Sequence, residues 1–81
     1  MMHAVVVYSR QGCHLCDLVK ETLRQTQGEA DFEWQEVDID GDPQLHQMYN
    51  DQVPVVFIDG RKAFKYHMDR HQFLRALAGR A

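Results

Sequence analysis

The only two cysteines of this 81-residue chain, Cys13 and Cys16, lie at the junction of two segments with different hydrophobic patterns. Residues 3–9 (HAVVVYS) are β-branched and nearly all apolar, which is typical of a strand buried on both faces. Residues 13–27 repeat apolar side chains at three- and four-residue spacing, which predicts an amphipathic helix. A strand, a C-x-x-C pair and a helix in immediate succession restrict the fold more than any other feature of the chain.

Strand-like and helix-like segments alternate along the rest of the chain. We expect further strands over residues 32–40, 52–60 and 61–68, a short helix with Pro43 in its first turn, and a last helix capped by Asp69. The turn dipeptide Asp59-Gly60 joins the last two strands in an antiparallel hairpin, and the first strand is expected to pair with the third through a helical crossover. The order β-α-β-α-β-β-α predicts an α/β domain in three layers, with a central mixed four-stranded sheet flanked by helices.

The spacing of the apolar residues also predicts the core. The inner faces of the three helices are assigned to Leu15, Leu18, Val19, Thr22 and Leu23, to Leu45, Met48 and Tyr49, and to Phe73, Leu74 and Leu77. Phe57, in the second dense apolar segment, is assigned to the core as well.

Composition excludes several classes of function. The length favours a single domain over residues 1–81, and 44% hydrophobic with 26% charged residues is ordinary for a globular chain. A net charge of −3 without a basic cluster argues against nucleic-acid binding. No apolar run is long enough to span a membrane, and the N-terminus lacks a signal-peptide pattern. We therefore expect a cytoplasmic monomer without a membrane partner.

A single C-x-x-C pair can be a structural crosslink, half of a metal site or a redox centre. A bridge across four residues closes too short a loop to stabilise the fold much through chain entropy. Zinc needs two further ligands, and the chain has no other cysteine and five histidines that surface positions explain. In a reducing compartment the redox role is favoured, so no metal site and no bound cofactor are expected.

The predicted helix start gives the two thiols different roles. The thiolate is the reactive form of cysteine, and the unpaired N–H groups at a helix N-terminus stabilise it. Cys13 lies at or just before that N-terminus, after a bend that Gly12 permits, so we expect its pKa to be lowered. Cys16 lies one turn further along the helix, close enough to resolve a mixed disulfide formed on Cys13.

Charged neighbours are expected to act on the same thiolate. Arg10 and Lys20 add positive charge near Cys13, and Asp17 opposes it. His14, between the two cysteines, can donate a hydrogen bond to the thiolate, although a solvent-exposed position explains it nearly as well.

A second candidate element is the proline in QVPVV, because a proline at the head of an apolar strand cannot donate to the sheet ladder. A cis Val53–Pro54 bond would turn the backbone of Val53 toward the cysteines, where its N–H and C=O can pair with an extended peptide or thiol substrate. Most X–Pro bonds are trans, so the residues alone favour the trans form and an ordinary edge proline.

The segments VVVYSRQGCHLCDLVKETL, VDID and VPVVFIDG occur in the order seen in glutaredoxins, and the chain resembles that family over residues 4–60. The resemblance implies a thioredoxin fold with cis-Pro54, a nucleophilic Cys13 and a resolving Cys16. It also implies a thiol–disulfide oxidoreductase that acts on a disulfide-containing protein or a small thiol. The residues expected to meet the substrate are Arg10, in the place of the family's usual lysine, His14, Val53 and Pro54.

The chain departs from the glutaredoxin pattern at two places. His14 and Leu15 replace the usual proline and aromatic residue, and Phe64 and Lys65 replace the Gly-Gly that holds the γ-glutamyl end of glutathione. The chain looks closer to the small bacterial glutaredoxin-like proteins, which keep C-x-x-C and V-P and lack Gly-Gly. Glutathione stays a candidate reductant beside a thioredoxin-type reductase, but we do not expect it to bind in the usual way.

Specificity and the class of function stay open at this point. Tyr66 and His67 lie where the family contacts the tail of its substrate, and they are the first candidates for an altered specificity. Two other functions use the same cysteine pair: a non-catalytic module that binds a peptide beside Pro54, and a carrier of zinc or an iron–sulfur cluster. Turnover of a disulfide would support the oxidoreductase, and metal or colour after anaerobic purification would support the carrier. The peptide-binding module would show neither.

Overall fold

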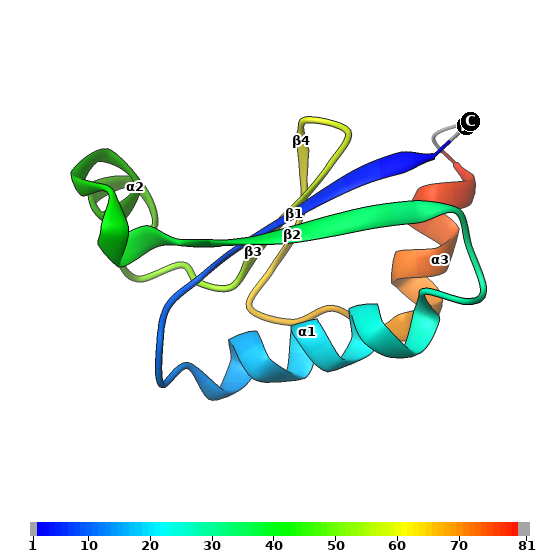
Figure 1. Ribbon diagram of the computed structural model, residues 1–81, viewed down its shortest axis with the longest axis horizontal. Coiled ribbons are helices and arrows are strands. Elements are labelled where there is room, and N and C mark those ends of the chain that lie inside the picture. Colours follow the sequence, from blue (N-terminus) through cyan, green and yellow to red (C-terminus); the bar gives the residue numbers. More distant parts are fainter. Residues whose placement is uncertain (1, 80–81) are drawn as a thin grey trace.

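A computed structural model describes residues 2–79 of the chain. Its elements are β1 (His3–Ser9), α1 (His14–Thr26), β2 (Phe32–Asp38), the short 3-10 helix η1 (Ile39–Gly41), α2 (Pro43–Tyr49), β3 (Val55–Ile58), β4 (Arg61–Lys65) and α3 (Arg70–Ala78) (Figure 1). The predicted order of strands and helices is confirmed. The three later strands are shorter than predicted; β2, for example, gives way to η1, and β3 begins only after Pro54.

The four strands form one mixed sheet in the order β2-β1-β3-β4. β1 runs parallel to β2 and antiparallel to β3, and β4 runs antiparallel to β3. The predicted pairing of the first and third strands is confirmed, but the helical crossover does not join them, because α1 connects β1 to β2. A parallel neighbour has to start at the same end of the sheet as β1, so it needs this crossover, whereas β3 runs back in the opposite direction.

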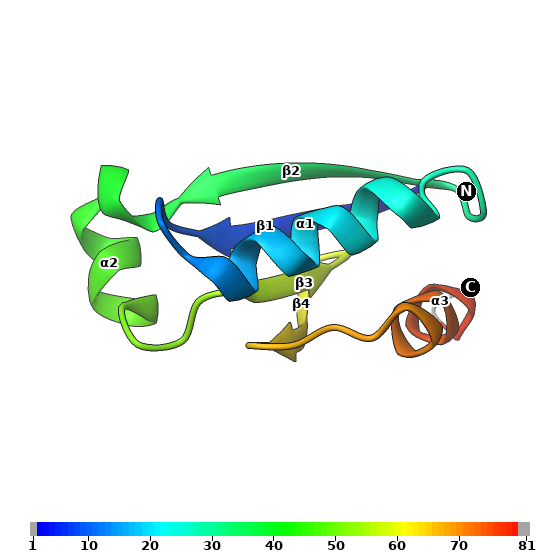
Figure 2. The ribbon, with the colours of Figure 1, turned by 90° about the horizontal axis from the view of Figure 1, so that it is seen from below.

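Helices cover both faces of the sheet, as the order of elements predicts. α1 and α3 lie on one face (Figure 2) and enclose the main core. The buried residues of this core are Val5, Val7, Val19, Leu23, Phe32, Val56, Ile58, Met68, Phe73 and Leu77. A smaller cluster contains Ile39 and Tyr49, the last residue of α2, together with Val55, and Tyr8 and Phe57 pack against it.

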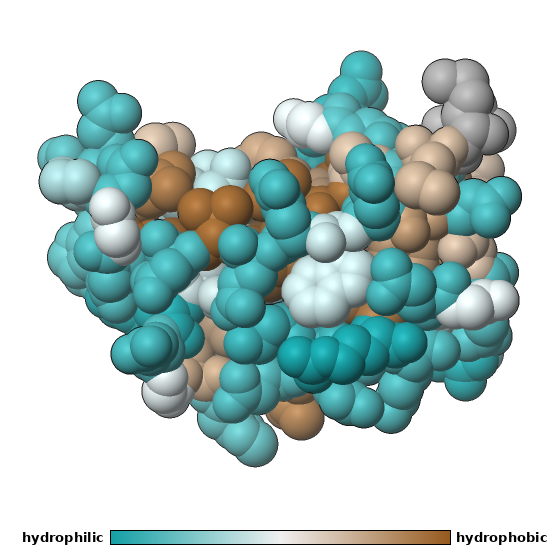
Figure 3. All heavy atoms as spheres, in the orientation of Figure 1, coloured by the Kyte–Doolittle hydropathy of each residue, from teal (hydrophilic) through white to brown (hydrophobic). Residues whose placement is uncertain are grey.

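The short helix α2 covers only one end of the sheet. It has seven residues, and its buried side chain is Tyr49. Figure 3 shows apolar atoms at the surface in the hollow between α2 and the β3–β4 hairpin. The layer on this side of the sheet is therefore thin, and the chain that follows α2 packs on this small cluster through Val53.

Two side chains that were assigned to the core are exposed. The buried stripe of α1 consists of Cys16, Val19, Leu23 and Thr26. Leu18 lies about 100° round the helix from its neighbour Val19, outside this stripe, and is 51% exposed. Met48 is 58% exposed because Leu45 and Tyr49, four residues apart, define the inner side of α2. Phe73 and Leu77 are buried as predicted, while Phe57 and Leu74 are half-buried.

The helices are short and begin at capping side chains. Asp69 caps α3, as predicted, and accepts the N–H of Gln72 at 3.1 Å. Asp42 caps α2 and accepts the N–H of Gln44 at 2.9 Å, with Pro43 in the first turn. None of the helices in the described part of the chain is long and apolar enough to cross a membrane.

We predict that two leucines of α1 differ sharply in their contribution to stability. Leu23→Ala removes a fully buried side chain from the main core and is expected to lower the free energy of unfolding by about 2–5 kcal/mol. Leu18→Ala removes an exposed side chain from the same helix and is expected to change it by about 0.5 kcal/mol or less. Urea unfolding followed by circular dichroism measures both, and equal losses would contradict the position of the stripe.

Candidate active site

The two cysteines lie at the first turn of α1, with Cys13 as its N-cap residue. The chain enters this turn through Gly12, whose φ of +76° lies in the left-handed region that favours glycine. Cys13 is extended, with φ −90° and ψ 107°, and its Sγ accepts the N–H of Cys16 at 3.1 Å. The start of the helix thus directs one of its free N–H groups at the sulfur of Cys13.

The cysteines form a disulfide and differ in their exposure. Their Cα atoms lie 5.2 Å apart. Cys16 is fully buried, whereas Cys13 is partly exposed. A reagent from solvent can therefore reach Sγ of Cys13 but not Sγ of Cys16. No group of three or more His, Cys, Asp or Glu side chains within residues 2–79 is placed to hold a metal ion.

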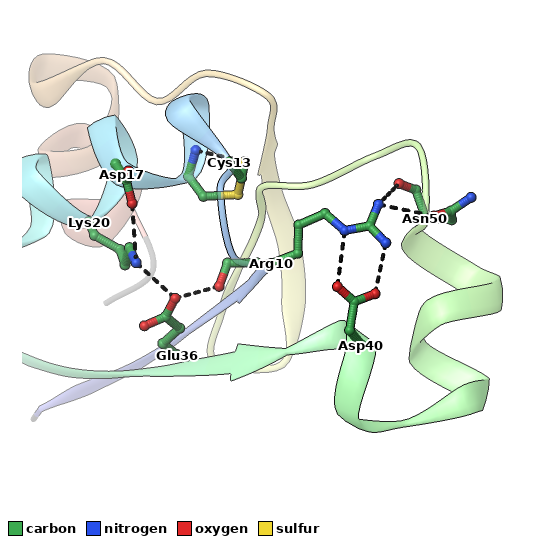
Figure 4. Close-up of a disulfide and its surroundings, with 9 residues drawn as sticks. Arg10, Cys13, Asp17, Lys20, Glu36, Asp40 and Asn50 are labelled. Atoms are coloured by element: carbon green, nitrogen blue, oxygen red, sulfur yellow. Dashed lines mark hydrogen bonds and ion pairs between the residues drawn. A yellow bond between two sulfur atoms is a disulfide. The ribbon is translucent and has the colours of Figure 1, made fainter.

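Arg10 lies just before the cysteine turn, but its guanidinium points away from Cys13 (Figure 4). Nη2 and Nε donate to the two carboxylate oxygens of Asp40 at 2.7 and 3.3 Å. Nη1 donates to the carbonyl oxygen and to Oδ1 of Asn50, both at 3.0 Å. The hydrogen bond between Arg10 and Asp40 lowers the pKa of Asp40 and raises the pKa of Arg10. The positive charge that was expected to act on Cys13 is therefore paired with a carboxylate.

Lys20, the second cation expected to act on the thiolate, is also paired. Its ammonium lies 2.9 Å from Oε2 of Glu36 on β2 and 3.4 Å from Oδ1 of Asp17 (Figure 4). Ser9, buried at the end of β1, donates to the same Oε2 at 2.5 Å. The hydrogen bonds from Ser9 and then from Lys20 lower the pKa of Glu36, and the bond to Glu36 raises the pKa of Lys20. These contacts join β1, β2 and α1 close to the cysteine turn.

The chain between α2 and β3, which contains Val53 and Pro54, passes near the start of α1 (Figures 1 and 2). The Val53–Pro54 peptide bond is cis. Pro54 is fully buried and Val53 is half-buried. No residue between 2 and 79 makes a hydrogen bond to the backbone N–H or C=O of Val53. This backbone thus keeps a free donor and a free acceptor near the cysteine pair.

Tyr66 and His67, the candidates for an altered specificity, line an apolar hollow next to the C-x-x-C motif. The hollow has a volume of about 230 Å³ and is lined by Leu15, Leu18, Val19, Thr22, Tyr66, His67, Met68 and Asp69. The fold therefore brings Tyr66 and His67 to the face of α1 that follows the cysteines. His14 is the first residue of α1 and is exposed, and its ring has no hydrogen-bond or ion-pair partner in the described part of the chain.

Three residues of the site were missed in the sequence: Ser9, Glu36 and Asn50. The signal for Glu36 was present, because the alternation Phe32, Trp34, Glu36 places it on the same face of β2 as two apolar residues that pack in the main core. The side chain of Glu36 is 40% exposed at the end of that face, and its carboxylate pairs with Lys20. Nothing in the sequence pointed to Asn50.

The chain matches the family described as Glutaredoxin-like domain (DUF836) over residues 4–78. An uncharacterized protein of Mycobacterium tuberculosis is 35% identical over 77 residues, which cover 89% of this chain and 78% of the relative. The solution structure of protein Ne2328 from Nitrosomonas europaea has a TM-score of 0.80 at 35% identity, and covers 94% of this chain and 92% of its own. Oxidized mitochondrial thioredoxin 3 of Saccharomyces cerevisiae shares the fold, with a TM-score of 0.67 at 15% identity over 95% of this chain and 77% of its own.

A mixed four-stranded sheet with a C-x-x-C disulfide at the start of its first helix defines a protein of the thioredoxin fold with a dithiol site. Within this class, the chain belongs to the glutaredoxin-like family (DUF836). The predicted fold and the predicted resemblance are both confirmed. The family match extends past residue 60, through the segment that lacks Gly-Gly.

We predict that Glu36 stabilises the fold above the acid range. Its pKa is lower in the folded chain than the ordinary value of 4.5, so its contribution is fully present above about pH 4.5 and is lost as the pH falls through the folded value. Glu36→Gln is expected to lower the free energy of unfolding at neutral pH by about 1 kcal/mol, a modest loss because solvent screens a carboxylate that is 40% exposed.

Urea unfolding of wild type and variant at about pH 7 and about pH 3 measures this contribution, and the difference between them is expected to narrow in acid. Glu33→Gln is the matched control, because Glu33 is an exposed glutamate on the same strand. A loss in Glu36→Gln that stays the same at both pH values would show that the carboxylate charge is not its cause.

Proposed function

We propose that this protein is a thiol–disulfide oxidoreductase that works by a dithiol mechanism. The thiolate of Cys13 attacks one sulfur of a substrate disulfide, forms a mixed disulfide and releases the other substrate sulfur, which takes up a proton. The thiolate of Cys16 then attacks Sγ of Cys13 and releases the second substrate sulfur as a thiol. The substrate gains two electrons and two protons, and the cysteine pair loses them and becomes the Cys13–Cys16 disulfide.

The observation that carries this proposal is the position of Cys13 Sγ at the N-cap of α1. The sulfur accepts the N–H of Cys16 at 3.1 Å, so the helix start supports negative charge on it. The exposure of Cys13 and the burial of Cys16 support the first as nucleophile and the second as resolving thiol. Because the reduced Cys13–Cys16 dithiol itself carries the two electrons, the reaction needs no resident cofactor.

The surroundings of Cys13 support a polypeptide disulfide as the substrate. The free backbone groups of Val53 suit an extended segment, and the hollow beside Leu15 and Tyr66 suits an apolar side chain. Phe64 and Lys65 stand where glutaredoxins have Gly-Gly, and both lie within β4, with Phe64 packed against the main core. We therefore assign glutathione the role of a candidate reductant and not of a tightly held ligand.

An external reductant has to restore the dithiol after each turnover. Glutathione or a thioredoxin-type reductase has the required chemistry, because two glutathione thiols, or one reductase dithiol, supply two electrons through thiol–disulfide exchange. A protein that works from its reduced form suits a reducing compartment, so we place it in the cytoplasm.

Single cysteine variants test the proposed roles. Cys13→Ser is expected to lower reduction of a disulfide-bonded protein by at least about 100-fold, because the nucleophile is lost. Cys16→Ser keeps the nucleophile and is expected to accumulate a mixed disulfide with the substrate, because the resolving thiol is lost. Mass spectrometry of the unreduced products identifies this adduct.

The assay is run in parallel with glutathione and with a thioredoxin system as the source of electrons. Turnover with either reductant supports the oxidoreductase and shows which one restores it. A folded wild type without turnover in either system would contradict the proposal and favour a peptide-binding module. Zinc or an iron–sulfur cluster retained after anaerobic purification would favour a metal carrier.

The reactivity of Cys13 is a separate prediction. In the reduced Cys16→Ser variant, the rate of alkylation by iodoacetamide is expected to rise with a midpoint below about 8.5, the pKa of free cysteine. His14→Ala in the same background is expected to raise that midpoint, because the residue that follows Cys13 can donate a hydrogen bond to the thiolate. A midpoint at or above that of free cysteine would contradict stabilisation by the helix start.

A further inference from the structure

The loop of residues 50–54 joins α2 to β3 and is held at its first residue by Arg10. Nη1 of Arg10 donates to the carbonyl oxygen and to Oδ1 of Asn50, both at 3.0 Å (Figure 4). The carboxylate of Asp40 holds the other side of the guanidinium at 2.7 and 3.3 Å. Because Arg10 lies three residues before Cys13, these bonds tie the 50–54 loop to the segment that carries this partly exposed cysteine.

Tyr66 makes two further hydrogen bonds to the same loop. Its hydroxyl donates to the carbonyl oxygen of Asp51 at 2.9 Å, and its backbone N–H donates to the carbonyl oxygen of Pro54 at 2.8 Å. Tyr66 has a φ of +71°, a left-handed conformation that residues other than glycine rarely adopt. The contacts of Tyr66 with the loop thus coincide with an unusual backbone conformation just after β4.

We propose that Arg10 and Tyr66 are positioning residues that clamp the 50–54 loop, so that the free N–H and C=O of Val53 are held ready for the backbone of a polypeptide disulfide. This inference rests on the proposed function. A loop that is ordered before binding avoids the loss of conformational entropy that a mobile loop suffers when substrate binds. Removing the clamp therefore weakens binding of a polypeptide more than it slows the chemical steps.

Arg10 acts in this proposal through Asn50 and not through its charge on Cys13. The guanidinium points away from the sulfur, and Asp40 neutralises it (Figure 4). The two roles predict different results for Asp40→Asn. If the charge acted on Cys13, freeing it from Asp40 would make alkylation faster at neutral pH. If Arg10 instead positions the loop, releasing the guanidinium from Asp40 weakens polypeptide binding and leaves the rate of Cys13 alkylation unchanged.

The test compares two disulfides, a disulfide-bonded polypeptide and the oxidized form of 2-mercaptoethanol, which has no backbone to pair with Val53. Arg10→Gln and Tyr66→Phe are each expected to raise KM for the polypeptide about five- to tenfold, with kcat within about twofold. KM for the small disulfide is expected to stay within about twofold. Arg10→Lys is not expected to restore the polypeptide KM, because an ammonium cannot reproduce the forked contacts with Asp40 and Asn50.

Arg70→Gln is the matched control, because Arg70 is a half-exposed arginine paired with Glu29 on another part of the surface. It is expected to leave KM for both disulfides unchanged. Amide hydrogen exchange gives a readout that is independent of turnover. The N–H of Gln52, which donates to the carbonyl oxygen of Tyr49 at 2.9 Å, is expected to exchange faster in Arg10→Gln and Tyr66→Phe than in Arg70→Gln or wild type.

Unchanged KM and unchanged exchange of Gln52 in both variants would overturn the clamp. A charge effect of Arg10 would instead slow the alkylation of Cys13 in Arg10→Gln and lower activity toward both disulfides equally, and Arg10→Lys would restore both. That result would overturn the clamp. If the wild type reduces neither disulfide, the proposed function is wrong, and the exchange of Gln52 then decides whether the loop is clamped. Thermal unfolding of each variant separates these outcomes from a general loss of the fold.

Discussion

The hydrogen bond from the N–H of Cys16 to Sγ of Cys13 connects the architecture of this protein to its chemistry. It forms because β1 ends in a turn with Gly12 in the left-handed region, which makes Cys13 the N-cap residue of α1. A sulfur here takes the place of the oxygen that usually caps a helix, so negative charge on it strengthens the cap. α1 is held on the sheet by a buried stripe that includes Cys16. The exposed position of one cysteine and the buried position of the other therefore both follow from packing one helix against one sheet.

Around this helix start, two cations are paired with carboxylates. Arg10 pairs with Asp40, and Lys20 pairs with Glu36. Such partly exposed pairs contribute little to stability one by one, but each joins segments that are distant in sequence. Their opposite charges largely cancel at the sulfur of Cys13, which leaves the backbone N–H groups of α1 as its main electrostatic support. Backbone dipoles do not titrate, so this support does not depend on the ionisation of neighbouring side chains.

The fold and the cysteine junction could be predicted because their signals are local. Hydrophobic periodicity and the C-x-x-C spacing each lie within one segment, and the family resemblance added the order of the segments. The direction of each side chain could not be predicted where it depends on packing between segments. Leu18 has the spacing of a core residue, yet the way α1 lies on the sheet turns it to solvent. The guanidinium of Arg10 is held by Asp40 and Asn50, which are 30 and 40 residues away in sequence.

These distant contacts also explain how so small a domain can present an ordered surface beside its cysteines. α2 is short, and of the 50–54 loop that follows it, Val53 packs on a small cluster and Pro54 is buried, whereas Asn50 and Asp51 are exposed. Arg10 and Tyr66 bind the exposed part of the loop through hydrogen bonds to Asn50 and Asp51. Where glutaredoxins have Gly-Gly, this chain continues β4 and then places Tyr66, whose hydroxyl reaches Asp51. In the proposed function, Phe64 and Lys65 thus lack the glutathione contact of Gly-Gly, and the adjacent Tyr66 adds a contact that orders the loop for a polypeptide.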